Sequence, residues 1–391
     1  MTERVRTRVA IAGAGPAGLL LSALLHRSGI ESVVVDSRSR EDIERTIRAG
    51  ILEQGTVEVL RALGGSRVDE VGRRHDGIEL RWRGVGHRID FAGLVGRSVW
   101  LYPQHEVLAD LLALRLAEDG DIRLGVTAVG VDGAESGAPI LHATGPGGEA
   151  VEITADVVVG ADGSRSVVRE AVSGAHGGWF REYPFAWFGI LCEAPPSAPE
   201  LIYSTSERGF ALVSQRSPDV QRMYLQCDPE LDPEAWSEAR IWDELQARVG
   251  GGLAEGPVFK RDVLRFRSFV AASLRRGRVL LAGDAAHTVP PTGAKGMNLA
   301  VADVVVLHRA LEMLVRDGSE AGLDAYEATA SRRIWRAQHF SWWMTSMLHA
   351  APGASGFDER RRIAELESVA ASRVGSAYLA EAYTGWPLEA L

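Results

Sequence analysis

The chain carries a glycine-rich segment whose residue types could bind a dinucleotide. Gly13, Gly15 and Gly18 follow a short apolar run, and Asp36 ends the next apolar run. Glycines at this spacing allow a tight turn and bring bare backbone N–H groups close to a pyrophosphate, while the carboxylate can accept hydrogen bonds from a ribose. We therefore expect a nucleotide site built on a strand, a turn and a helix.

Two further apolar runs end in the same residue types. Asp162 follows the run 157–161, and Asp284 follows the run 280–283. After Asp284 comes a loop with two prolines and two glycines, and then a helical pattern from about residue 297. Such a loop and helix N-terminus could stabilise negative charge on a flat, electron-rich ligand. A Gly–Asp pair also occurs in ordinary turns, so these segments indicate a site only in combination.

Composition excludes several classes of protein. With 46% hydrophobic and 24% charged residues, the chain of 391 residues can bury a large core. A net charge of −9, with arginines interspersed among acids, argues against a nucleic-acid partner. Cys192 and Cys227 lack metal-type spacing, so we expect no metal site and a reducing cytoplasm. Glycines and Pro16 inside the run 9–25 argue against a signal peptide, and no stretch predicts a membrane span.

The order of the patterns predicts an α/β fold with a Rossmann-like nucleotide-binding domain, a second, sheet-based domain and a helical C-terminal region. We expect the first domain at 1–178, with an excursion of strands near 77–102 toward the second domain. The second domain is expected at 179–267. Residues 268–391 are expected to return to the first domain and then to form helices that close over the site.

Several shorter segments carry their own expectations. The segment 45–55 is helix-like and contains Arg48, which is either a solvated arginine or a guanidinium paired with phosphates. Further helices are expected at about 106–118 and 234–248. Trp342 and Trp343 are expected in the core.

Together, these motifs resemble those of the class A FAD-dependent aromatic hydroxylases. Within that family, the resemblance is to the members that act on 4-hydroxybenzoate. It implies FAD as cofactor, NADH or NADPH and O₂ as co-substrates, and hydroxylation at the 3-position through a flavin hydroperoxide. The match runs almost from end to end, over residues 13–18, 47–55, 160–163, 208–212, 283–284, 290–296 and 340–346.

The resemblance also assigns cofactor contacts. It implies that Asp36 holds the adenosine ribose, that Arg48 holds the pyrophosphate, and that Asn298 with its helix faces the pyrimidine end of the flavin. The complete set of implied cofactor contacts is Gly13, Gly15, Gly18, Asp36, Arg48, Gln104, Asp162, Arg222, Asp284, Lys295 and Asn298.

Substrate contacts follow from the same resemblance. A phenolate donates electrons better than a phenol, and the implied phenol-side residues are Tyr203, with Tyr383 behind it and His75 at the solvent end of a proton relay. The carbonyl of Pro291 is implied near the substrate hydroxyl. The benzoate carboxylate is assigned to Ser214, Arg216 and Tyr224.

Each of these residues also has an ordinary structural explanation. Tyrosines commonly pack as amphipathic core residues, and most loop histidines carry no proton in catalysis. Ser214 and Arg216, two apart on a strand, share a face and could belong to a surface salt-bridge ladder. The functional interpretation therefore depends on the joint match.

The coenzyme residues depart from the family pattern. The implied contacts are Arg38, Arg165 and Arg267, but Arg165 stands where the family has histidine and Thr46 where it has arginine. Acidic residues at 41, 42 and 44 would repel a 2′-phosphate. We therefore predict use of NADH, or of both coenzymes, over strict preference for NADPH.

Two alternatives remain open at this stage. One is a hydroxylase of another para-substituted benzoate, such as 4-aminobenzoate, because Arg216 would bind any benzoate carboxylate. The other is a flavin-binding or ligand-sensing protein without catalysis. We also expect a homodimer.

Overall fold

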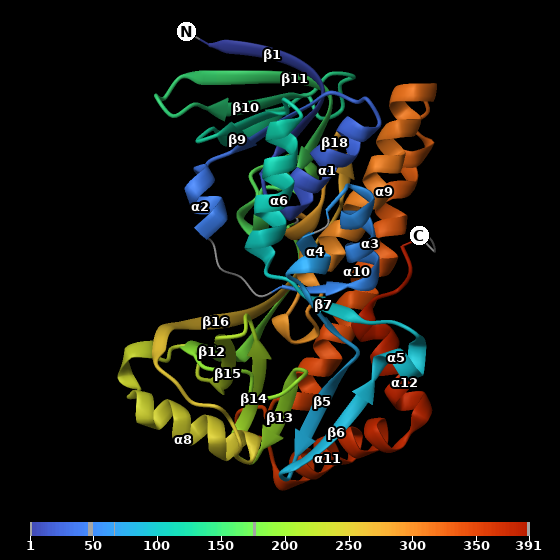
Figure 1. Cartoon of the computed structure of the whole chain (residues 1–391). Coiled ribbons are helices and arrows are strands. Elements are labelled where there is room, and N and C mark those ends of the chain that lie inside the picture. The colour runs from blue at the N-terminus through green and yellow to red at the C-terminus, as the bar shows by residue number, and fades with distance from the viewer. Residues whose placement is uncertain (1, 46–49, 66, 175–176, 389–391) are drawn as a thin grey trace.

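The computed structural model describes residues 2–45, 50–65, 67–174 and 177–388. Figure 1 shows an upper part, a lower part and a narrower junction, with helices running between the two parts. The α/β fold predicted from the sequence is confirmed.

A largely parallel sheet organises the upper part, and its register explains why the three Gly/Asp segments meet. Ala12 pairs with both Val35 and Gly160, and Gly160 pairs with Leu281. The carboxyl ends of these strands therefore lie at one edge, where α/β proteins bind ligands. The sheet runs in the order β17 (Arg275–Arg276), β18 (Val279–Leu281), β11 (Ala150–Gly160), β1 (Glu3–Ala12), β2 (Ser32–Asp36) and β8 (Asp121–Leu124), with β10 (Ile140–Thr144) and β9 (Thr127–Asp132) attached to β11.

Helices cover this sheet with apolar side chains. Leu19, Leu20 and Leu21 of one helix are all buried, as are Val33 and Val34 of the strand beside it. These residues share one core cluster. The helices of the upper part are α1 (Pro16–Arg27), α2 (Arg40–Arg45), α3 (Gln54–Ala62), α4 (Arg67–Glu70), α6 (Gln104–Ala117), α7 (Val168–Ser173) and α9 (Gly296–Asp317).

A small sheet lies at the junction. It consists of β3 (Ile51–Glu53), β7 (Val99–Leu101) and β4 (Arg73–His75), with β7 in the middle and antiparallel to both neighbours. The helix-like pattern expected over 45–55 is therefore wrong at residues 51–53, because pairing with β7 overrides the local pattern.

A second sheet organises the lower part. Successive side chains on its strands point to opposite buried faces: Leu212 and Tyr224 belong to one core cluster, whereas Val213, Met223 and Leu225 belong to another. The sheet runs in the order β19 (His287–Thr288), β16 (Val258–Ala271), β12 (Gly178–Glu193), β15 (Val220–Cys227), β14 (Gly209–Gln215), β13 (Ile202–Ser206), β5 (Gly77–Trp82) and β6 (Val85–Asp90). Figure 1 shows β5 and β6, from the first quarter of the chain, beside β13.

Helices cover both faces of the second sheet. One face packs against α8 (Glu238–Val249), which begins later than expected because the Ser237 side chain caps it by accepting from the Arg240 N–H. The other face, which includes Tyr203 of β13, packs against the C-terminal helices, one of which carries Tyr383. These helices are α10 (Ala321–Leu348), α11 (Gly356–Ala371) and α12 (Arg373–Thr384), with the short α5 (Phe91–Val95) beside them.

Two surface features complete the fold. Trp342 is 41% exposed, so its expected place in the core is wrong, while Trp343 is half-buried.

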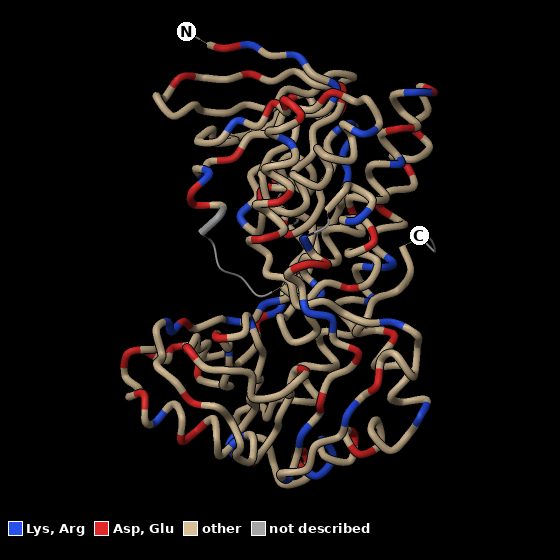
Figure 2. Tube along the Cα trace, in the orientation of Figure 1, with Lys and Arg blue, Asp and Glu red and all other residues tan. Residues whose placement is uncertain are grey.

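Over the described residues, Figure 2 shows acidic and basic positions interspersed along the trace. In the same part of the chain, no helix is long and apolar enough to cross a membrane.

Candidate active site

The glycines of the first turn have two different structural roles. Gly13 has a φ of +105°, and a Cβ there would lie 2.3 Å from the Ala161 carbonyl oxygen. A Cβ at Gly18 would lie 1.8 Å from the Gly13 carbonyl oxygen. A Cβ at Gly15 would meet nothing closer than 3.9 Å. Gly13 and Gly18 are therefore required by the packing of the chain, whereas Gly15 leaves backbone open to a ligand.

The N-terminus of α1 lies directly behind this open backbone. Its N-cap residue, Gly15, offers no side-chain hydrogen bond, and Pro16 occupies the first turn. The N–H groups of such a terminus suit a phosphate.

Asp36 lies at the end of β2 and is already hydrogen-bonded. Its carboxylate accepts from the Ala14 N–H at 2.7 Å and from Arg38 Nε and Nη2 at 2.9 and 2.8 Å. Burial by itself would raise the pKa of Asp36, but the bonds from Arg38 and Ala14 outweigh it and lower the pKa. Asp36 is thus a carboxylate held in place beside the glycine turn, and Arg38 is paired with it.

Asp162 presents an unused acceptor. Its Oδ2 accepts from the Val167 N–H at 2.8 Å, whereas Oδ1 is buried and has no hydrogen-bond partner among the described residues. Burial raises the pKa of this carboxyl group. A buried unpaired acceptor is costly unless a ligand satisfies it, so Asp162 fits a hydroxyl-bearing group such as that of FAD.

Asp284 lies beside a buried pair that the sequence did not single out. Asp284 is half-buried on the short turn Gly283–Ala285. The Gly283 N–H donates to Asp303 Oδ2 at 2.9 Å, and His287 Nε2 lies 2.5 Å from the same oxygen. Asp303 of α9 therefore holds the turn that presents Asp284.

Asn298 joins the start of α9 to the small sheet. Its Oδ1 accepts from the Glu53 N–H at 2.9 Å and from Thr56 Oγ1 at 2.8 Å. Its Nδ2 donates to the Ile51 and Ala294 carbonyl oxygens at 2.8 and 2.9 Å. Because these bonds occupy the side chain, a cofactor contact at this position falls to the backbone of the helix N-terminus. Gln104 is the first residue of α6 and is half-buried.

Lys295 belongs to a buried ion-pair cluster. Its Nζ donates to Glu53 Oε1 at 2.6 Å and to the Tyr383 carbonyl oxygen at 2.9 Å, and Arg333 Nη2 lies 3.6 Å from Glu53 Oε2. Burial lowers the pKa of Lys295, and Glu53 opposes that effect. Neither Glu53 nor Arg333 was among the site residues expected from the sequence, although Glu53 lies in the matched segment 47–55; folding brings both to Lys295.

The tyrosine pair forms between the second sheet and α12. The Tyr203 and Tyr383 hydroxyls are 2.6 Å apart, and the Tyr203 hydroxyl also donates to the Thr292 carbonyl oxygen at 3.4 Å. Thr292 neighbours Pro291 on the turn Pro291–Gly293. Burial raises the pKa of both tyrosines, so both are neutral and able to pass a proton at ordinary pH.

His75 ends β4 and is buried. Its Nδ1 has no hydrogen-bond partner within the described ranges, and burial lowers the pKa of its imidazole. The structure gives no direct hydrogen bond between His75 and Tyr383 in that part of the chain.

The expected carboxylate end lies on the same sheet. Tyr203, Leu212 and Tyr224 are aligned across β13, β14 and β15, which puts their side chains on one face. Arg216 follows β14, and burial lowers the pKa of its guanidinium to about 10. Such a dehydrated cation favours an anionic partner.

Ser214 and Arg222 are paired across β14 and β15 at the same end of the sheet. Arg222 lies 4.9 Å from the Tyr224 ring and makes an ion pair with Asp262 at 2.9 Å.

Two of the three expected coenzyme residues, Arg165 and Arg267, lie where the two parts join. Arg267 of β16 donates to Ser164 Oγ at 2.7 Å, and Arg165 is the next residue on the turn Gly163–Arg165. The third, Arg38, donates to Asp36 at 2.8 Å beside the glycine turn. Arg48 and Thr46 lie outside the described residues.

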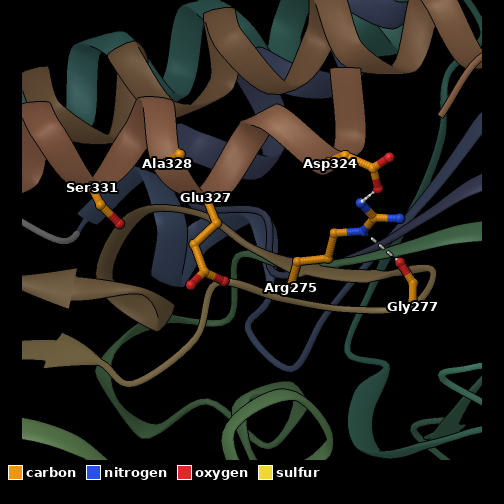
Figure 3. Close-up of a pocket in the computed structure, with 6 residues that line it drawn as sticks. All are labelled: Arg275, Gly277, Asp324, Glu327, Ala328 and Ser331. Atoms are coloured by element: carbon orange, nitrogen blue, oxygen red, sulfur yellow. Dashed lines mark hydrogen bonds and ion pairs between the residues drawn. The ribbon is translucent and has the colours of Figure 1, made fainter. Parts of the chain in front are cut away.

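The groove in Figure 3 is a different place. It has a volume of about 510 Å³ and lies between α10 and β17. Arg275 donates to the Gly277 carbonyl oxygen at 2.8 Å and pairs with Asp324, while Glu327 accepts from Ser273 Oγ at 2.6 Å. Its charges already have partners, so we do not take it as the active site.

The fold and this arrangement define a class of enzyme. A family profile described as FAD binding domain matches residues 6–341, and the chain belongs to that family. It is a class A FAD-dependent aromatic hydroxylase that uses NAD(P)H, which confirms the predicted cofactor and enzyme class.

Individual relatives narrow the resemblance. The chain is 40% identical to p-hydroxybenzoate hydroxylase of Acinetobacter baylyi, over 99% of this chain and 97% of that one. It is 31% identical to 6-methylpretetramide 4-monooxygenase of Streptomyces rimosus, over 86% of this chain and 82% of that one. The crystal structure of p-nitrophenol 4-monooxygenase from Pseudomonas putida superposes with a TM-score of 0.81 at 23% identity, covering 98% of this chain and 99% of that one. The chain is thus p-hydroxybenzoate hydroxylase-like.

Proposed function

We propose that this hydroxylase converts 4-hydroxybenzoate to 3,4-dihydroxybenzoate. The observation that carries the proposal is the 2.6 Å hydroxyl pair of Tyr203 and Tyr383 on the same sheet face as Tyr224, near Arg216. One end suits a phenol and the other suits a carboxylate, which are the two substituents of this substrate. The identity to the Acinetobacter enzyme supports the same substrate.

FAD, when bound, supplies the redox chemistry: it accepts hydride from NAD(P)H and transfers one oxygen atom of O₂ to the ring. The residues that would hold it are the open backbone at Gly15, the carboxylates of Asp36, Asp162 and Asp284, and the N-terminus of α9 at Asn298. Two features of the described residues fit FAD: Asp162 Oδ1 is buried without a hydrogen-bond partner, and the N-terminus of α1 has no side-chain cap.

The residues of the chain act on the phenol. Lowering the pKa of a phenol from about 10 to about 7 requires roughly 4 kcal/mol of preferential stabilisation of the phenolate. Tyr203 would donate to the phenolate oxygen, and the Pro291 carbonyl would accept from the hydroxyl of the neutral phenol before its proton leaves. Lys295 contributes less than an isolated cation would, because Glu53 neutralises much of its field.

A proton must leave when the phenolate forms. Tyr203 would accept it while passing its own proton to Tyr383, and His75 would receive it through water. At the other end, Ser214, Arg216 and Tyr224 would bind the carboxylate, where one charge-assisted hydrogen bond contributes about 1.5–3 kcal/mol.

The coenzyme site is proposed at Arg267 and Arg165, with NADH or both coenzymes as hydride donors. The ion pair of Arg38 with Asp36 supports this choice, because an occupied guanidinium is a weaker ligand for a 2′-phosphate.

We also propose a homodimer in the cytoplasm. Trp179 and Trp335 are 57% and 47% exposed and pack edge to face at 5.6 Å, and the exposed Phe180 and Trp342 add to the apolar surface. Sedimentation velocity tests the dimer.

The proposed domain boundaries remain 1–178, 179–267 and 268–391, with 77–102 contributing strands to the second domain.

The decisive experiment measures anaerobic flavin reduction by NADH and by NADPH, with and without 4-hydroxybenzoate, followed by admission of O₂. Strong acceleration by the substrate and formation of 3,4-dihydroxybenzoate are expected. Reduction that the substrate does not accelerate, or that ends only in peroxide, would redirect the assignment to another para-substituted benzoate such as 4-aminobenzoate.

A further inference from the structure

A charged groove opens outside His75. It has a volume of about 410 Å³, and its charged lining residues are Arg74, Asp76, Glu79, Arg88 and Glu200. Two of these residues, Arg74 and Asp76, are the chain neighbours of His75; Arg74 is exposed and Asp76 is half-buried, while His75 between them is buried. The groove is therefore the part of the surface that lies next to the buried imidazole along the chain.

Glu200 is held against this segment by a two-pronged ion pair. Arg88 Nε and Nη2 donate to its Oε2 and Oε1 at 2.8 and 2.9 Å. The Glu200 side chain is only 15% exposed, and its Oε2 lies 3.0 Å from the position that a Cβ at Gly77 would take. The carboxylate thus presses against backbone two residues beyond His75.

The same segment leads directly to the tyrosine pair. Leu201, the next residue, accepts from the Glu79 N–H at 2.9 Å, and Tyr203 follows on β13 beside β5. One short stretch of chain therefore carries both Tyr203, at the inner end of the proposed proton relay, and Glu200, at its outer end.

Other charges near His75 do not substitute for Glu200. Burial lowers the pKa of His75, Glu200 makes the largest opposing contribution, Arg73 lowers the pKa further and Asp76 raises it. Asp76 is occupied by Arg74 at 2.8 Å and Ser98 at 2.6 Å.

The other strands packed around His75 offer little negative charge that could stabilise its protonated form in place of Glu200. From β6, Asp90 lies 3.2 Å from Arg88, and from β7 the apolar Val99 pairs with His75. On β5, Glu79 accepts from Arg81 at 2.7 Å.

We propose that Glu200 is a positioning residue for proton release through the negative charge of its carboxylate: it stabilises protonated His75 and marks the groove through which the proton reaches solvent. The inference rests on the proposed function, because it requires that the phenol proton reach His75. The imidazole takes up one proton on one ring nitrogen and releases another from the other nitrogen to water, so Glu200 keeps its charge throughout.

The test follows proton release when FAD-loaded enzyme is mixed with 4-hydroxybenzoate in weak buffer containing a pH indicator. We expect Glu200→Gln to slow release roughly tenfold, because removal of the neighbouring negative charge leaves the protonated imidazole of His75 less stable. Added imidazole should restore the rate. Glu79→Gln, in the same groove, is the matched control and should leave the rate unchanged.

A second variant separates charge from bracing. Arg88→Met breaks the same ion pair but keeps the Glu200 carboxylate, so release should stay close to the wild-type rate. Equal slowing in Arg88→Met and Glu200→Gln, failure of both to fold, or an unchanged rate in FAD-loaded Glu200→Gln would each overturn the inference. Absence of proton release in the wild type would instead overturn the proposed relay, and this inference with it.

Discussion

Replacing Gly15 by alanine separates a glycine needed for a ligand from glycines needed for packing. The backbone at Gly15 has φ −80° and ψ −176°, which alanine adopts without strain. Loss of unfolded-state freedom stabilises the variant by about 0.4–1 kcal/mol, while alanine at an N-cap costs a similar amount. With no atom within 3.9 Å of the new Cβ, the free energy of unfolding of the apoprotein should stay within about 1 kcal/mol of wild type.

The effect of Gly15→Ala on the affinity for FAD should be much larger than its effect on stability. The added methyl group would occupy the space through which a pyrophosphate approaches the backbone. We expect at least a tenfold increase in the Kd for FAD, equivalent to about 1.4 kcal/mol. Quenching of flavin fluorescence on titration into apoprotein measures the Kd, and urea denaturation measures stability.

Two variants serve as controls. Gly130→Ala on β9, where a Cβ also meets nothing within 4 Å, should change neither quantity. Gly13→Ala should destabilise the apoprotein by about 2–4 kcal/mol, because φ is positive and its Cβ meets a carbonyl oxygen. Unchanged FAD affinity in folded Gly15→Ala, or unfolding as severe as that of Gly13→Ala, would refute the reasoning.

Three further predictions concern stability and coenzyme choice. Lys295→Met should lower the free energy of unfolding, measured in urea, by about 3–5 kcal/mol, because the Glu53 carboxylate stays buried after it loses its cationic partner. The double variant Lys295→Met/Glu53→Gln removes that buried charge and should recover most of the loss. A loss below about 1 kcal/mol in Lys295→Met would contradict this prediction. Burial lowers the pKa of His349 to about 3, so the unfolded chain binds a proton at this residue near pH 6.5 while the folded protein does not. The folded state therefore loses about 2 kcal/mol of stability between pH 7 and pH 5. His349→Gln should reduce the dependence of the free energy of unfolding on pH, measured by urea denaturation. Steady-state kinetics should give a higher kcat/KM for NADH than for NADPH, and a clear preference for NADPH would show the prediction wrong.

Local patterns in the sequence predicted many of the strands and the edge at which they meet. Apolar runs ending in Gly or Asp predicted strand ends that meet at one edge, and the register of β1, β2, β11 and β18 puts them there. Period-two alternation indicated the strands of the second sheet. These signals are readable because turn chemistry and strand periodicity depend on neighbouring residues.

Local patterns failed where pairing between distant segments decided the outcome. Residues 51–53 read as helix but form a strand beside β7, and Trp342 read as core but lies on the surface of α10. Nothing in the sequence indicated that Arg38 pairs with Asp36, and its expected contact with the coenzyme stays a prediction.

By itself, the sequence determined the nucleotide-binding fold, the enzyme class and a set of polar residues worth testing. Only the tertiary structure decided how those residues are connected: Tyr203 meets Tyr383 across 180 residues, and Lys295 meets Glu53 across 242. It also brought Glu200 beside the segment that carries His75. The physical reason is that a buried polar side chain takes its partner from whichever elements pack around it, and no sequence spacing encodes that packing.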